Sequence, residues 1–222
     1  MQITKKDKDF IRDYINFGLY HNLKINLILK EAFNKSKNLN DRMIYYIDLF
    51  SNLMRLTEIM EMVIYSIKKK GRGKGFWRTF IRYNANIDVA KKYLQEAESY
   101  KKQPIEYFHD VLLLNTNKFS EILKKKDVKI DATFWENNLH NIIQSLKLRI
   151  HHSARRSYNK IKHGFPIIGR KDKILIFIDV LGNNKLDVVS FTYKESEIGR
   201  LIDYTKFFTE TIRSLLSLTL IS

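Results

Sequence analysis

Apolar residues recur every three or four positions along most of the chain, which is the spacing of one face of an α-helix. The pattern has few interruptions, because the chain contains only two prolines and eight glycines. It predicts helices over residues 7–33, 41–69, 86–102, 104–114, 118–126, 131–162 and 195–220. Asp41 is the expected N-cap of the second of these helices.

Two short segments have a different pattern, typical of β-strands. Residues 174–180 and 186–193 are rich in β-branched and aromatic side chains, and a glycine–asparagine turn lies between them. They predict a β-hairpin at about residues 173–193, just before the last helix. The expected fold is therefore mainly α. It is a single helical domain over residues 1–222, a helical bundle with a β-hairpin inserted before the C-terminal helix.

The charge of the chain adds an expectation about its partner. Lysine and arginine number 40 against 24 aspartates and glutamates, which gives a formal net charge of +16. Such an excess predicts an acidic partner, which is a nucleic acid, an anionic membrane surface or an acidic protein. The abundance of lysine, asparagine and isoleucine also fits coding bias from an AT-rich genome, so charge alone does not name the partner. With no cysteine, no secretory signal and no long apolar run, a soluble cytoplasmic protein without a membrane partner is expected.

The strongest candidate for chemistry is the basic segment of residues 149–165, RIHHSARRSYNKIKHGF. On one continuous helix, a single stripe would hold Arg149, His152, Arg156, Lys160 and His163, with Asn159 at its edge. An apolar face that includes Leu146 and Ile150 would lie next to this stripe. The pattern predicts that the stripe binds a polyanion, and its imidazoles suggest chemistry on that polyanion.

Arginine and histidine together suit the cleavage of a phosphodiester without a metal. The guanidinium of Arg156 would hold the scissile phosphate, and the imidazole of His163 would act as acid or base. Arg149, His152, Asn159, Lys160 and Lys162 would position the RNA backbone. The alternative reading is structural, because cations near the end of a helix are also favoured by the helix dipole.

The segment from Arg156 to His163 resembles the motif of the HEPN superfamily, an arginine followed after four to six residues by a histidine. That resemblance implies a HEPN-like helical bundle and a metal-independent ribonuclease with Arg156 and His163 as catalytic residues. It also implies a homodimer in which two motifs face each other. The family analogy suggests a toxin or effector in bacterial phage defence (abortive infection), with an antitoxin or another defence-system subunit as a possible partner. Ser157 stands where many active members have Asn, Asp or His directly after the arginine.

A second basic segment, KKKGRGKGFWR at residues 68–78, predicts a flexible loop. Arg72 and Lys74 would contact a phosphate backbone while Phe76 or Trp77 stacks on a base. The alternative is a solvated helix end whose two aromatic residues return to the core. The sequence predicts no metal site and no cofactor. The leading hypothesis is an RNA endonuclease. Its rivals are a non-catalytic HEPN-like nucleic-acid-binding or scaffold subunit and a protein-interaction subunit.

Overall fold

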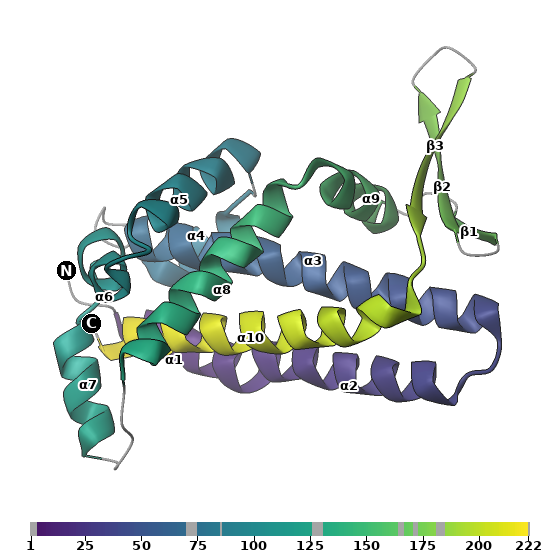
Figure 1. Ribbon diagram of the computed structural model, residues 1–222. Helices are drawn as coiled ribbons and strands as arrows, with labels where there is room; N and C mark the ends of the chain where they lie inside the picture. The colour runs from purple at the N-terminus through teal and green to yellow at the C-terminus, as the bar shows by residue number, and fades with distance from the viewer. Residues whose placement is uncertain are drawn as a thin grey trace. The chain divides into compact units, whose positions relative to one another are not determined.

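The structure is a computed structural model that describes residues 4–69, 75–84, 86–125, 131–163, 167–170, 173–180 and 185–221. The chain is mainly helical, as predicted (Figure 1). It divides into two compact units. Unit 1 comprises Met1–His21, Leu56–Ile150 and Phe207–Ser222, and unit 2 comprises Asn22–Arg55 and His151–Lys206. The long helices α3 (Leu39–Lys69) and α10 (Ile198–Ile221) contribute residues to both units.

The first predicted helix is one helical run with a π-helical turn inside it. The run consists of α1 (Lys5–Asp13), the turn η1 (Tyr14–Leu19) and α2 (Tyr20–Lys35). The next helix, α3, begins at Leu39 rather than at Asp41, so the predicted N-cap is wrong. The side chain of Asn38 takes that role, because its Oδ1 accepts a hydrogen bond from the N–H of Asn40 at 2.8 Å.

Most other helices of unit 1 follow their predicted positions. They are α5 (Ile87–Ser99), α6 (Pro104–Glu106) with the π-helical turn η3 (Tyr107–Val111) and α7 (Thr116–Lys124). Helix α8 (Ala132–Ile150) begins where it was predicted but ends earlier. Helix α5 packs against α8. Buried aromatic rings complete this core, with the centroids of Phe108 and Trp135 only 5.1 Å apart.

Sequence patterns did not predict α4 (Phe76–Arg82), which lies directly after the glycine-rich segment. Its first N–H groups need acceptors, and the residue before it, Gly75, has no side chain to offer one. Asp7 supplies the acceptor, because its Oδ1 receives the N–H of Trp77 at 3.0 Å. Its other oxygen accepts hydrogen bonds from Thr4 in a capping box at the start of α1. One buried carboxylate therefore caps two helices.

Replacing Asp7 by alanine is expected to lower the free energy of unfolding by about 1–3 kcal/mol, because the N–H of Trp77 loses its acceptor. Asp9→Ala is the matched control, since Asp9 is an exposed carboxylate on the same helix. Urea titration of both variants measures the difference. Equal midpoints for the two variants would contradict this role of Asp7.

Unit 2 contains the β-sheet. The sheet has the order β1 (Ile167–Arg170), β2 (Lys173–Val180), β3 (Lys185–Thr192), and both pairs are antiparallel (Figure 1). The predicted strand pair is confirmed, with Ile174 opposite Phe191 and Val180 opposite Lys185. Strand β1 was not predicted. Ile174 enters a buried apolar cluster of unit 2 with Phe33, Met43, Tyr46, Ile47, Leu49 and Ile198.

Polar contacts join the 3₁₀ turn η4 (Glu195–Glu197), at the start of α10, to α3 within unit 2. Arg42 forms an ion pair with Glu195, and the hydroxyl of Tyr46 donates to Glu197 at 3.0 Å. Burial, together with the charge of Glu197, raises the pKa of the Tyr46 phenol, so this hydroxyl remains a donor at neutral pH.

The prediction of one long helix over residues 131–162 is wrong. Helix α8 ends at Ile150 and α9 (His152–Lys162) begins two residues later, because His151 has an extended backbone with φ −62° and ψ 116°. The two parts belong to different units. The stripe expected from a continuous helix is therefore divided between Arg149 and His152.

Candidate functional site

Helix α9 has one buried face and one exposed face. Ser157 and Tyr158 are buried, and Ile161 packs against the apolar cluster of unit 2. The opposite face is exposed and carries His152, Arg156, Asn159 and His163, which we call the α9 stripe. At about 100° per residue these four positions lie within a sector of roughly 60°. The stripe therefore faces away from the buried side of its own helix, rather than next to it as the sequence suggested.

Local contacts define both ends of this helix. At the start, Nδ1 of His151 accepts the N–H of Ala154 at 3.4 Å and lies 3.2 Å from Oγ of Ser153. At the end, the N–H of His163 donates to the carbonyl of Asn159 at 3.1 Å. Arg156 and His163 are thus two turns apart, about 10 Å along the helix axis. Long side chains at this spacing can reach one sugar–phosphate linkage.

The segment around the stripe is strongly basic. Residues 151–163 include two arginines, two lysines and three histidines, and no aspartate or glutamate. Lys160 is half-buried, whereas Lys162 is exposed with its Nζ 5.6 Å from the ring centroid of Tyr158. An exposed helix face of this composition favours the binding of a polyanion.

Arg149 is buried, although it was predicted to lie on the basic stripe. It lies on α8 in unit 1 and is 5% exposed, with its Nε 3.0 Å from Oε2 of Glu61 and its Nη2 3.7 Å from Oε1 of Glu58. These contacts with α3 hold the guanidinium in the interior, so Arg149 does not lie on the exposed surface where it was predicted. It is a buried ion-pair partner instead.

Glu61 is the centre of this buried network. Besides Arg149, it accepts a hydrogen bond from the hydroxyl of Tyr83 and one from the N–H of Asn86 at 3.0 Å. Burial and the hydrogen bond to Glu61 raise the pKa of the Tyr83 phenol. No sequence pattern had singled out Glu61 or Tyr83, because their partners are far apart in the chain.

The remaining predicted residues belong to the basic segment of residues 68–78. Arg72 and Lys74 lie outside the described residues. Phe76 is 1% exposed and returns to the core, which confirms the structural alternative for this side chain. Trp77 is half-buried, and Nζ of Lys6 lies 4.4 Å from its ring centroid.

No protein family, no curated protein and no solved structure matches this chain. Its function is therefore inferred from its own residues.

The cavity beside α9 does not contain the stripe. It has a volume of about 380 Å³ and is lined by Tyr158, Ile161 and Lys162 of α9, together with residues of α2 and α3 that include Asp48 and Arg55. Burial raises the pKa of the Asp48 carboxyl. The α9 stripe lies on open surface instead, which suits an extended polymer better than a small enclosed ligand.

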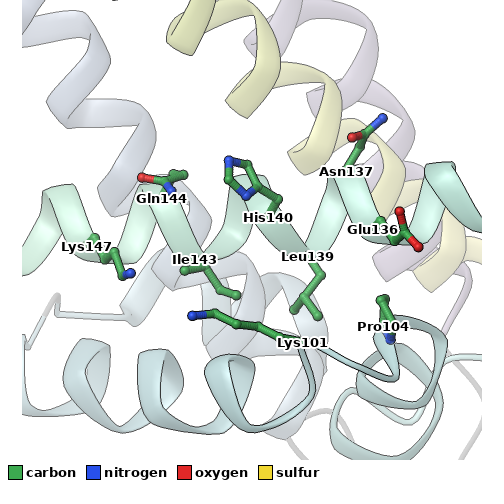
Figure 2. A pocket seen from close by; sticks show the side chains of 9 residues that line it. All are labelled: Lys101, Pro104, Glu136, Asn137, Leu139, His140, Ile143, Gln144 and Lys147. Carbon is green, nitrogen blue, oxygen red and sulfur yellow. The ribbon is translucent and has the colours of Figure 1, made fainter.

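A second cavity, of about 450 Å³, lies along α8 in unit 1 (Figure 2). Leu139 and Ile143 point towards Lys101 and Pro104, whereas His140 points to the other side of the helix (Figure 2). Lys101 and Lys147 both form ion pairs with Glu98, and the hydrogen bond from Lys147 lowers the pKa of that carboxyl. The imidazole and the ammonium groups do not converge, so this cavity is a weaker candidate for catalysis.

Within the described ranges, no cluster of three or more histidines, aspartates or glutamates is arranged to hold a metal ion. Over the same part of the chain, no helix combines the length and the apolar character that crossing a membrane requires.

Proposed function

We propose that this protein is a metal-independent, HEPN-like RNA endonuclease with Arg156 and His163 as its catalytic residues. The observation that carries the proposal is the α9 stripe, in which both side chains are exposed on one face of one helix, two turns apart. The basic segment around them supplies attraction for a phosphate backbone.

The proposed reaction uses the ribose itself as the nucleophile. His163, acting as base, removes the proton from a 2′-hydroxyl, and the resulting oxygen attacks the adjacent phosphorus. The bond from phosphorus to the 5′-oxygen breaks, and that oxygen receives a proton. Arg156 stabilises the charge that develops on the phosphoryl oxygens. The products carry a 2′,3′-cyclic phosphate and a 5′-hydroxyl.

A homodimer is part of this proposal. The reaction needs one base and one acid, and the α9 stripe of one chain supplies a single His163. A second copy of the chain, related by a two-fold axis, would supply the second imidazole. His152, Asn159, Lys160 and Lys162 would position the RNA strand. By resemblance to the HEPN superfamily, the biological role is that of a toxin or effector in phage defence, with an antitoxin or another defence-system subunit as partner.

The test is cleavage of total RNA and of a fluorescent oligonucleotide by the purified full chain in the presence of EDTA. Arg156→Ala is expected to slow cleavage by about 10²–10³-fold, because a donor to the phosphoryl oxygens is lost. Arg200→Ala is the matched control, since Arg200 is an exposed arginine of unit 2 on α10. Intact RNA with the wild-type chain, or equal rates for the two variants, would refute the proposal.

The buried position of Ser157 favours a second candidate function. Ser157 is 3% exposed and belongs to the buried face of α9, so the residue after the arginine adds no polar group to the stripe. A non-catalytic nucleic-acid-binding or scaffold subunit would use the same surface. Such a protein would bind RNA with an affinity that falls steeply with salt while the RNA stays intact for hours.

A further inference from the structure

A third cavity, of about 490 Å³, lies in unit 1, and none of its lining residues belongs to the α9 stripe. Its lining includes Tyr65 of α3, Arg78 and Arg82 of α4, and Tyr83, Asn84 and Asn86, which precede α5. Its volume falls within the range of pockets that bind small ligands. Its lining combines aromatic rings, guanidinium groups and amides in one place.

A hydrogen bond to the buried Glu61 holds the aromatic part of the cavity in position. The ring centroids of Tyr65 and Tyr83 are 4.4 Å apart with an angle of 37° between the planes, and both side chains are half-buried. The hydroxyl of Tyr83 donates to Glu61, whose carboxylate is itself paired with Arg149. The Tyr83 ring is thus fixed at its hydroxyl by a buried ion pair, and Tyr83 is part of the cavity lining.

The basic part comes from one face of α4. Arg78 and Arg82 are four residues apart, so they lie one helical turn from each other, and both are exposed. The guanidinium group of arginine matches the oxygens of a phosphate with paired N–H donors. Two such groups on one wall of a cavity favour an anionic end of a ligand.

The amide part is also ordered. Asn86 donates its N–H to Glu61 at 3.0 Å, and its Oδ1 accepts the N–H of Asp88 at 2.9 Å. The neighbouring Asn84 is exposed and lines the same cavity. Side-chain amides both donate and accept hydrogen bonds, as the edge of a nucleobase requires.

From this combination we infer that the cavity binds a nucleoside phosphate, with the base against Tyr65 and Tyr83 and the phosphate at Arg78 and Arg82. The amides of Asn84 and Asn86 lie within the same cavity for contact with the base edge. The ligand is either a free nucleotide or one nucleotide of an RNA strand. The inference does not depend on RNA cleavage, because the lining of this cavity shares no residue with the α9 stripe.

Calorimetric titration of the full chain tests this site with AMP, GMP, CMP and UMP, with the corresponding nucleosides, with inorganic phosphate and with a mixed-sequence hexaribonucleotide. At least one monophosphate or the hexanucleotide is expected to bind tenfold or more tightly than nucleoside or phosphate alone. The variant Arg78→Gln/Arg82→Gln is expected to weaken this binding at least tenfold. The matched control is Arg12→Gln/Arg213→Gln, which removes two exposed arginines of unit 1 outside the cavity.

The aromatic wall has its own test. Tyr65→Leu is expected to weaken binding about tenfold, because stacking of a base on an aromatic ring contributes strongly to affinity, whereas Tyr65→Phe retains it. Tighter binding of a monophosphate identifies a free nucleotide as the ligand, and tighter binding of the hexanucleotide identifies a strand.

Absence of binding by all probes, or equal affinities for the arginine variant and its control, would overturn the inference. Titration of Arg156→Ala/His163→Ala separates this result from the proposed function. The nucleotide is expected to bind this variant as it binds the wild type, whatever the outcome of the RNA cleavage assay.

Discussion

Arg149→Met is expected to lower the free energy of unfolding by about 3–5 kcal/mol, since breaking a buried ion pair leaves an uncompensated charge. That charge is on Glu61, which is 0% exposed and lies 3.0 Å from the guanidinium Nε. Methionine fills much of the same volume, so the loss reports the missing charge rather than a cavity. Urea titration followed by circular dichroism measures the change.

Lys147→Met provides the control for this variant. Lys147 is on the same helix, but its ion pair with Glu98 is partly exposed, so its removal is expected to cost about 1 kcal/mol or less. The double variant Arg149→Met/Glu61→Gln is expected to recover part of the loss, because the buried negative charge is then absent as well. Equal unfolding midpoints for Arg149→Met and Lys147→Met would show that the buried pair has no special role.

For the proposed nuclease, His163→Ala is expected to lower the single-turnover rate of RNA cleavage by about 10²–10⁴-fold, the usual contribution of a general acid or base. Its free energy of unfolding is expected to stay within about 0.5 kcal/mol of the wild type, because His163 is exposed at the end of α9. Gel analysis of RNA under enzyme excess measures the rate.

His152→Ala is the comparison for that prediction. His152 is an exposed imidazole on the same stripe, at the opposite end of α9 from His163. The proposed function assigns His152 to positioning the RNA strand, so this variant is expected to affect RNA affinity more than the rate at saturating protein. Equal rate losses for the two histidine variants would contradict the assignment of His163 as the acid or base.

The sequence predicted the parts of the fold that depend on local patterns. Helical periodicity and the scarcity of glycine and proline located the helices, and β-branched residues around a glycine–asparagine pair located β2 and β3. The break at His151 carries no such signal, because neither glycine nor proline is present there and histidine is an uncommon N-cap. Helix α4 was missed because its N-terminal N–H acceptor is Asp7, which lies 70 residues before its partner Trp77.

Arg149 was predicted on the exposed stripe but is buried, because its ion-pair partner is distant in the sequence. On a helical wheel it aligns with the cations of α9, but its partner Glu61 is 88 positions away in the sequence. By contrast, Arg156 and His163 depend only on the local helix, so their common exposed face could be predicted. Whether they act on RNA depends on chemistry that periodicity does not report.

Helix α2 shows the same limit for apolar residues. Leu27 is one of the apolar residues that recur at helical spacing in residues 7–33, yet it is 52% exposed, whereas Asn26 is 3% exposed. The amide of Asn52 on α3 explains this arrangement, because its Nδ2 donates to Oδ1 of Asn26 at 2.5 Å and to the carbonyl of Asn22 at 3.2 Å. A polar side chain with a distant partner can be buried where periodicity alone would place a leucine.

The way in which the two units share the chain limits how the protein can be dissected. Unit 1 draws on Met1–His21, Leu56–Ile150 and Phe207–Ser222, and unit 2 draws on the segments between them. No single cut therefore yields a fragment that holds all of one unit and none of the other. Removing the last helix to isolate the basic surface would take residues from both units. Single-residue substitutions in the full-length chain, rather than truncated fragments, are the suitable way to assign activities to its parts.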